Sequence, residues 1–392
     1  MERKLFLESC FFVIDGYPNM LRHPLRRAAV ATLLCLAIPA IEPTSANASD
    51  HADPMLFNDP ESNITGLFFF PKDDRMIVIL NVRRQLTKPV PYNLEPFEYA
   101  IRMDLHSQVT FDDPAEKARY GGTVVSPDRI KEDVTIAFHL NPDASVKTVT
   151  YTGLKNQDQI RVFTGVRDDP FVFPRFFKKN VISMVLSIPR TSFPDGQQDF
   201  LLWGTVFKGT TQIDHVGRSN RSQQARFEGL NTRHPSQHVA SLMKRMAFWD
   251  GLYNPLNHNK ETKPIADFVQ ILLQNRPYDL APDVMIYSSR FPVGFPNGRL
   301  LTDDVAALTC ATGDCILQDL SFIEDSSWPR KVVNDHPFMD EFPYLAAPGA
   351  VTEPPIVGSL KARVMMAIMA FVAVAVLLWL YRWRLYARAT VG

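Results

Sequence analysis

The sequence predicts a mainly β fold, sandwich- or barrel-like, with a few helices in the C-terminal half and one C-terminal transmembrane helix. Strand-like alternation of apolar and polar residues recurs between residues 67 and 207. The 30 prolines interrupt helices, and the 27 phenylalanines suit the half-buried surface of a sheet. An uncharged apolar run at 364–381 has the length of a membrane span. The net charge of zero argues against a nucleic-acid partner.

Six segments of the first half carry strand patterns. Residues 76–80 are continuously apolar and β-branched, which is typical of a strand buried on both faces. The other five alternate apolar with polar residues or form short apolar runs: 99–105, 134–140, 160–162, 182–188 and 200–207. Turn-forming residues separate several of them, at 71–74, 141–143 and 194–196. This spacing favours a sandwich or a barrel.

Beyond residue 232 the apolar spacing becomes helical. Val239 begins one such stripe, and Pro264 begins a second predicted helix. A third is expected near Thr302, with Asp303 and Asp304 in its first turn. Residues 284–287 have the pattern of one further strand. The predicted exported part, 49–343, is therefore one large β-rich domain or two lobes, about 49–232 and 233–343.

The N-terminal residues 1–48 have the features of a leader with a signal sequence. Basic residues at 22–27 precede an apolar run at 28–41, and Ala46-Asn47-Ala48 matches a cleavage site. Met20 stands just before the basic residues, so a start at Met20, with 1–19 a mis-assigned start, is one alternative. A retained anchor is another, and Sec and twin-arginine export both stay open.

The C-terminal end has the features of a membrane anchor. A proline- and glycine-rich stalk at 344–363 leads to the predicted transmembrane helix at 364–381, which a short basic tail at 382–392 follows. With a cleaved signal sequence, this order predicts a single-pass protein of the inner (cytoplasmic) membrane. The main domain is then expected in the periplasm or outside the cell.

Only two of the four cysteines follow the predicted leader. Cys310 and Cys315 lie five positions apart, and outside the cytoplasm such a pair is expected to form a disulfide that closes a small loop. A metal site would require further soft ligands nearby, and none is apparent in the sequence.

The most suggestive acidic segment is the run Arg167, Asp168, Asp169. Paired carboxylates on an exported loop are a reasonable source of ligands for Ca²⁺, which prefers several oxygen atoms. The alternative is an Asp-Pro turn in which Arg167 holds the acidic side chains across the loop. The sequence leaves both interpretations open.

A second candidate is the loop from Gly294, with Asn297 and Arg299, together with the acidic pair Asp303 and Asp304. These residues could bind a cation or ligand, although a turn at Asn297 and a helix first turn at the acidic pair explain them better. Weaker metal candidates are His51 and Asp53, beside the predicted cleavage site. His234 and His238 have metal-ligand spacing, but Pro235 intervenes, so we interpret them as surface or capping histidines.

Three separated segments together resemble the bacterial domain of unknown function 4331 family. They are 63–70 (NITGLFFF), preceded by 51–54 (HADP), then 163–171 (FTGVRDDPF) and 294–305 (GFPNGRLLTDDV). Asn63 and Gly66 stand where members of that family tend to carry aspartates. The resemblance implies an exported, β-rich bacterial protein and implies no particular reaction.

The sequence leans away from an enzyme, because no H-E-x-x-H, G-x-S-x-G, haem-attachment or P-loop motif occurs. The first hypothesis is a membrane-anchored, non-catalytic envelope module that binds a ligand, a cation or a protein partner of the envelope. A metal- or haem-dependent redox or hydrolytic subunit is the second hypothesis. An assembly factor beside a membrane complex is the third. The cofactor is unknown, with Ca²⁺ the candidate cation.

Overall fold

The computed structural model describes residues 59–350, apart from residues 85, 87–89, 174–176, 220, 222–226, 248–262, 264–279 and 313–332. All described residues belong to one compact unit, Ser45–Glu353. The predicted leader, the second predicted helix near Pro264, the transmembrane helix and the basic tail lie outside the described residues. Within the described part of the chain, no helix is both long and apolar enough to cross a membrane.

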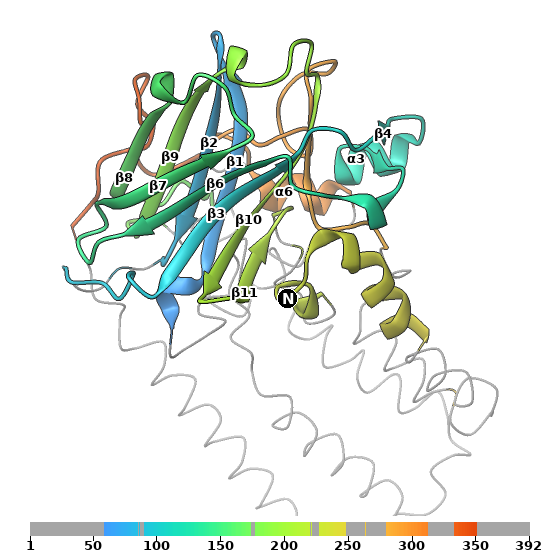
Figure 1. Cartoon of the computed structure of the whole chain (residues 1–392), viewed down its shortest axis with the longest axis horizontal. Helices are drawn as coiled ribbons and strands as arrows, with labels where there is room; N and C mark the ends of the chain where they lie inside the picture. Colours follow the sequence, from blue (N-terminus) through green and yellow to red (C-terminus); the bar gives the residue numbers. More distant parts are fainter. Residues whose placement is uncertain are drawn as a thin grey trace, which may run out of the picture. The chain divides into compact units, whose positions relative to one another are not determined.

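The first sheet has four antiparallel strands in the order β1-β2-β9-β8 (Figure 1). They are β1 (Ile64–Lys72), β2 (Arg75–Val82), β8 (Arg161–Asp168) and β9 (Asn180–Pro189). Residues 72–75 form the tight turn between β1 and β2, which pair from Ile64↔Val82 to Lys72↔Arg75. This arrangement places β8 at one edge of the sheet, so the end of β8 is next to only one other strand.

The second sheet has six antiparallel strands. Its main order is β11-β10-β3-β6-β7, and β12 pairs with one end of β10. The bounds are β3 (Phe97–Asp104), β6 (Val134–Leu140), β7 (Val146–Thr152), β10 (Asp199–Lys208), β11 (Thr211–Val216) and β12 (Met285–Ser288). The predicted return of one strand near 284–287 is thus confirmed by β12.

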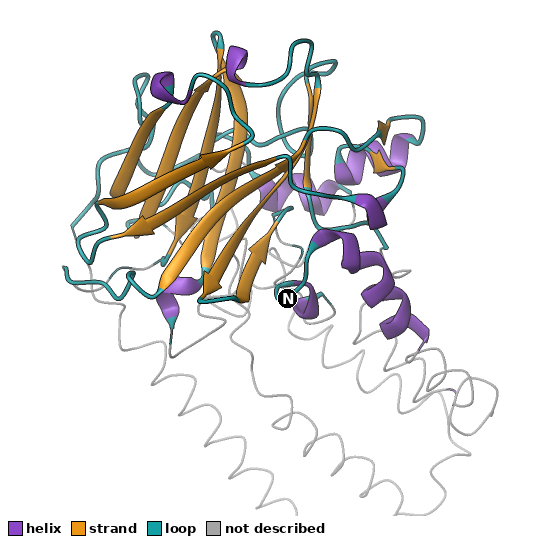
Figure 2. Cartoon of the chain, viewed as in Figure 1, coloured by secondary structure: helices purple, strands orange, loops and turns teal. Residues whose placement is uncertain are grey.

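Short elements connect and flank the two sheets (Figure 2). The strands β4 (Val109–Thr110) and β5 (Thr123–Val124) pair as a two-stranded ribbon, and α3 (Pro114–Tyr120) lies between them in the sequence. The helix α6 (Val305–Ala311) follows β12. Residues 238–247 are also helical. The single-turn 3-10 helices are η1 (Pro60–Ser62), η2 (Pro127–Arg129), η3 (Gln157–Gln159), η5 (Arg190–Ser192), η6 (Glu228–Leu230) and η7 (Pro235–Gln237).

The main core lies between the two sheets. Phe69, Val78 and Leu80 of the first sheet belong to the same buried cluster as Ile101 and Phe138 of the second sheet. Burial of apolar surface on this scale is the dominant favourable contribution to folding. The predicted mainly β, sandwich-like fold with a few helices is therefore confirmed.

The outer face of the first sheet is also covered. Phe68, Ile77 and Ile79 point away from the main core, because neighbouring side chains of a strand alternate between faces, and they form a second buried cluster that includes Tyr344 and Leu345. This explains why 76–80 is continuously apolar. It also shows that the first residues of the predicted stalk pack on the sheet, beside β8.

Candidate metal centre

The end of β8 and the segment at 333–350 meet at one edge of the first sheet. The backbone N–H of Asp168, the last residue of β8, donates to the carbonyl of Ala346 at 3.3 Å. Asn180 of β9 exchanges two hydrogen bonds with the backbone of Gly349, each 2.9 Å long. The Lys178 N–H donates to Asp335 Oδ2 at 2.7 Å. These bonds hold the segment at 333–350 against the ends of β8 and β9.

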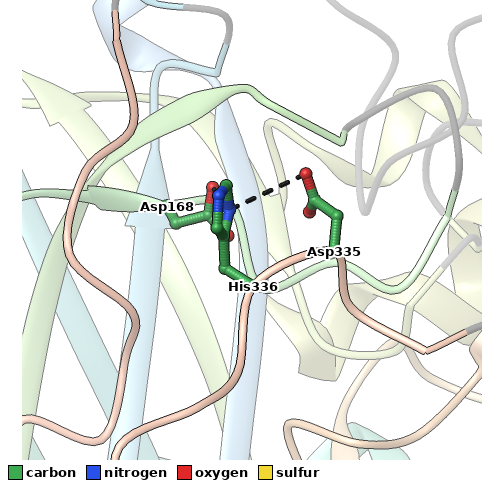
Figure 3. Close-up of side chains that lie close together, drawn as sticks. All are labelled: Asp168, Asp335 and His336. Atoms are coloured by element: carbon green, nitrogen blue, oxygen red, sulfur yellow. Dashed lines mark ion pairs between the residues drawn. The ribbon is translucent and has the colours of Figure 1, made fainter.

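Three side chains with metal-ligating atoms converge at this edge: Asp168, Asp335 and His336 (Figure 3). One possible ligand atom from each lies within 4.8 Å of the others. His336 Nδ1 is 3.1 Å from Asp168 Oδ1 and 3.7 Å from Asp335 Oδ2. Two ligand atoms on one metal, each at about 2.1 Å, are roughly 3.0–3.4 Å apart. The present spacing therefore requires only a small adjustment to hold an ion.

Several atoms of this cluster are short of hydrogen bonds. Asp335 Oδ1 and the neighbouring Asn334 Oδ1 are buried and have no hydrogen-bond partner among the described residues. Asp168 Oδ1 and His336 Nδ1 are also buried and, within the described part of the chain, face each other at 3.1 Å. Asn334 turns its Nδ2 toward Asp168 Oδ2, at 3.2 Å. Buried polar atoms without partners are uncommon, and an ion is one of the explanations for them. A divalent cation would satisfy all three ligand atoms at once.

The electrostatics of the cluster disfavour the ionisation of both carboxyl groups in the absence of a cation. Burial, and after it the charge of Asp335, raise the pKa of Asp168 to about 6, against the opposing effects of His336 and Asn334. The Asp168 side chain is 1% exposed, whereas that of His336 is 42% exposed. The cluster is therefore open to solvent on the His336 side and carries negative charge at neutral pH, which favours a cation.

The ligand types suggest which ion would suit the site. Ca²⁺ takes six to eight oxygen ligands, so the imidazole of His336 makes it a poorer fit than the carboxylates alone suggested. An imidazole with two carboxylates suits a divalent transition metal such as Zn²⁺ or Mn²⁺. Three protein ligands would leave coordination positions for an outside ligand.

Of the seven predicted cation- or ligand-binding residues, Asp168 alone joins a metal-ligand cluster within the described ranges. Its neighbour Asp169 is paired with Arg84 instead, and both side chains are only 1% exposed. Arg84 also donates to the Thr65 carbonyl at 2.8 Å, and Asp169 accepts from the Phe171 N–H at 3.0 Å. This buried pair joins the end of β2 to the end of β8.

The predicted pairing of Arg167 with the acidic turn is not the one that forms. The Arg167 guanidinium lies 4.3 Å from the ring centroid of Phe163, which is four residues earlier on the same face of β8. The two adjacent aspartates have different partners: Asp168 lies beside Asp335 and His336, whereas Asp169 is paired with Arg84. Arg84 comes from the end of β2, a contact that local sequence does not reveal.

The predicted second site forms a well-bonded loop. Asn297 Oδ1 accepts from the Ser288 N–H at 2.7 Å, and its Nδ2 donates to the carbonyls of Ser288 and Pro292. Asp303 Oδ2 accepts from the N–H groups of Phe295 and Leu300, at 2.8 and 2.7 Å. These bonds explain both residues as loop-forming, and their role in binding stays a prediction.

The remaining two residues of the second site, Arg299 and Asp304, also have structural contacts within the fold. Arg299 is buried, with its guanidinium 4.1 Å from the ring of Phe68. Asp304 is the N-cap of α6 and accepts from the Ala307 N–H at 3.0 Å. The helix therefore begins at Val305, three residues later than Thr302, near which its start was expected.

The histidine pair is only partly as predicted. His234 caps η7, as expected, by accepting from the Ser236 N–H. His238 is fully buried rather than superficial. Its Nδ1 accepts from the Asp283 N–H at 3.1 Å, and its Nε2 lies 3.0 Å from the Arg233 carbonyl. Both ring nitrogens are thus used in packing.

Three other predicted residues lie outside the described residues: His51, Asp53 and Cys315. Cys310 is on α6. The disulfide and the weak N-terminal metal site therefore stay predictions.

Sequence reasoning missed Asp335 and His336. They lie in a short polar segment with no recognisable motif, and the neighbouring Asn334 is 166 positions from Asp168, to which it is hydrogen-bonded. The adjacency of an aspartate and a histidine was the single available signal. It was too common to indicate a site.

Fold and site together define a class: an antiparallel β-sandwich protein with a carboxylate–histidine cluster at one sheet edge. No protein-family model and no curated protein matches the chain. Among solved structures, the crystal structure of ACE19, the collagen binding subdomain of Enterococcus faecalis surface protein ACE, matches with 13% identity and a TM-score of 0.12. The match covers 37% of this chain and 84% of that chain. A TM-score this low supports no argument, and the resemblance to the domain of unknown function 4331 family stays a prediction.

Proposed function

We propose that this protein is an exported, membrane-anchored β-sandwich that binds a divalent transition metal through Asp168, Asp335 and His336, as a non-catalytic binding module of the envelope. The observation that carries the proposal is the convergence of ligand atoms from two carboxylates and one imidazole within 4.8 Å of one another, with Asp168 Oδ1 and His336 Nδ1 both buried. The predicted signal sequence and anchor support the location. The family resemblance, which implies an exported protein, supports it too.

The metal would have two roles in such a module. It would cross-link the end of β8 to the segment at 333–350, adding to the backbone hydrogen bonds and to the apolar packing of Tyr344 and Leu345 that already hold this segment on the sheet. Its open coordination positions would accept a carboxylate or imidazole from a ligand or partner at the exposed His336 side. A binding role is favoured because the cluster is at a sheet edge and partly exposed to solvent.

The proposal is tested by metal titration of the full chain after dialysis against EDTA. We expect saturable binding of Zn²⁺ or Mn²⁺ at one site by isothermal titration calorimetry, with weaker binding of Ca²⁺. Asp335→Asn and His336→Gln should each raise the dissociation constant about tenfold or more, as removal of a ligand requires.

Matched controls come from exposed residues of the same types. Asp340→Asn changes an exposed carboxylate on the same segment, and His139→Gln changes an exposed histidine on β6. Both controls should bind metal like the unaltered chain. Equal losses in controls and site variants, or no binding of any of the three ions below millimolar concentration, would contradict the proposal.

A further inference from the structure

The strand β7 forms one edge of the six-stranded sheet (Figure 1). On its inner side it pairs with β6, regularly over Thr148–Thr152, whereas Lys147 falls at a register shift. On its outer side, no backbone hydrogen bond joins Thr148–Thr152 to any residue in the described ranges. A strand edge with unpaired N–H and C=O groups is a template on which a further strand can pair.

The other edge strands of the two large sheets are better protected than β7. In β1, Phe69 exchanges two backbone hydrogen bonds with Arg299. The strand β8 carries Arg161 and Arg167, and charged side chains discourage edge-to-edge pairing. The last three residues of β11 are buried. The outer side of β7 is therefore the edge most accessible to another strand.

The sequence of this edge also favours strand pairing. Residues 148–152 read Thr-Val-Thr-Tyr-Thr, all of them types with high β-propensity, and include no proline, glycine or charge. Proline and lysine are common devices that protect natural edge strands. The nearest charged residue, Lys147, is at the register shift, and its Nζ lies 3.1 Å from Glu95 Oε1. Its charge is therefore balanced within the chain.

The main core is incompletely covered at β7. Val149 and Tyr151 are half-buried and pack against the main core, whereas the three threonines Thr148, Thr150 and Thr152 are exposed on the other face. A strand paired with the outer side of β7 would cover the exposed parts of Val149 and Tyr151. Removing this apolar surface from water would favour association.

We propose that β7 pairs in antiparallel orientation with β7 of a second copy of this chain, with the two-fold axis at Thr150. In this register Thr148 lies opposite Thr152 of the other copy, and Val149 lies opposite Tyr151. Thr–Thr pairs and aromatic–β-branched pairs are among the favourable cross-strand pairs. The Thr-x-Thr-x-Thr pattern is thus complementary to itself, as a two-fold contact requires.

The charges near the edge agree with this register. The position opposite Lys147 is Gly153 of the other copy, so no like charges face each other across the axis. A second copy therefore supplies a matching strand without any change in the fold, and the contact joins two six-stranded sheets into one. The contact shares no residue with Asp168, Asp335 and His336, so the inference goes beyond the function proposed above and does not depend on it.

The first test is sedimentation velocity of the full chain in detergent over a series of concentrations. We expect a monomer–dimer equilibrium. Thr150→Asp and Thr150→Lys should each raise the dimer dissociation constant about threefold to tenfold, because like charges then lie directly opposite each other at the axis. An equimolar mixture of the two variants should restore the dimer, because Asp then faces Lys. This restoration also shows that both variants are folded.

The second test is cross-linking through Thr150→Cys. Residues directly opposite each other in an antiparallel pair have Cβ atoms about 4.5–5.5 Å apart, so mild oxidation should give a disulfide-linked dimer beyond the background of the unaltered chain. The matched control is Thr211, an exposed threonine at the start of the edge strand β11. Thr211→Asp should dimerise normally, and Thr211→Cys should not cross-link. Asp168→Asn, in the metal cluster, should also dimerise normally.

Three results would overturn the proposal. The first is a chain that stays monomeric throughout the concentration series, as expected if β7 pairs with a strand of a different protein. The second is a dimer that the two charge variants of Thr150 do not weaken, or that their mixture does not restore. The third is equal cross-linking of Thr150→Cys and Thr211→Cys. Loss of metal binding with normal dimerisation would count against the proposed function alone.

Discussion

Two clusters in this β-sandwich contain similar residues, aspartate and histidine, but differ in how completely their polar atoms are hydrogen-bonded. Around Asp283 and His238, both carboxylate oxygens and both ring nitrogens have partners. Around Asp168 and His336, Asp168 Oδ1 and His336 Nδ1 are buried and face each other at 3.1 Å, and Asp335 Oδ1 is buried with no hydrogen-bond partner among the described residues. The first cluster is complete without a ligand, whereas the second requires a proton or a cation. Composition alone does not distinguish a structural cluster from a binding site.

The largest expected effect comes from breaking the complete cluster. Asp283→Asn removes the buried carboxylate beside Arg218 and Arg221, and one-sided loss of a buried pair typically costs about 3–5 kcal/mol. The urea midpoint of Asp283→Asn at pH 7 should therefore be strongly lowered. The control Asp340→Asn, which changes an exposed aspartate, should have nearly the same urea midpoint as the unaltered chain. A loss below about 1 kcal/mol would mean that the cluster does not depend on this charge.

The next effect is the pH dependence that His238 confers. Burial lowers the pKa of His238 to about 3, and the charge of His215 acts in the same direction, while Asp283 and the bond to Arg233 oppose it. The unfolded chain takes up this proton near pH 6.5. The contribution to stability is therefore complete above pH 6.5 and is lost as the pH falls toward 3, by up to a few kcal/mol.

His238→Asn tests that assignment. Asparagine can still accept from the Asp283 N–H and does not titrate, so the variant should lose less stability than the unaltered chain between pH 6.5 and 4. The measurement is urea unfolding at each pH, with His139→Asn as the control at an exposed histidine. Parallel pH profiles for His238→Asn and the unaltered chain would exclude His238 as the source.

Metal addition should raise stability by a smaller amount that depends on concentration. At one hundred times the dissociation constant, Zn²⁺ should stabilise the folded chain by about 2.7 kcal/mol, and EDTA should reverse the change. Asp168→Asn should abolish the response because it removes the most buried ligand. An equal response in this variant would place the bound metal elsewhere.

The smallest effect concerns Asp168 in the absence of metal. Its pKa is raised to about 6 by burial and by Asp335, so the folded state holds a proton that the unfolded state has already released. The stability from this group is present below about pH 4 and is lost as the pH rises through 6. Asp168→Asn should then be more stable than the metal-free unaltered chain at pH 7.5, on the order of 1 kcal/mol after solvent screening.

The same comparison at pH 4.5 provides the control. There the unaltered Asp168 is largely protonated, and the difference between the two chains should shrink. A constant difference at both pH values, or a destabilised variant at pH 7.5, would show that burial does not strain this carboxylate.

Strands were well predicted where they are buried on both faces or alternate strictly. The segments at 76–80, 134–140 and 182–188 lie within β2, β6 and β9. By contrast, β7 was not predicted, because it is a threonine-rich edge strand that is mostly exposed and carries little apolar periodicity. The helix α3, which Asp113 caps by accepting from Ala115 and Glu116, was also missed in a segment with few apolar residues.

Local patterning was enough to establish the mainly β class and most strand positions, and to select Asp168 as a candidate, since alternation, turn residues and acidic pairs are encoded within a few positions. Long-range pairing established the rest. Hydrogen bonds from Asp168 and Asn180 to residues 346 and 349 bring Asp335 and His336 to the end of β8. Meanwhile Arg84 neutralises Asp169. Which of two adjacent aspartates is free to bind a cation depends on partners far away in the chain, and no local pattern specifies them.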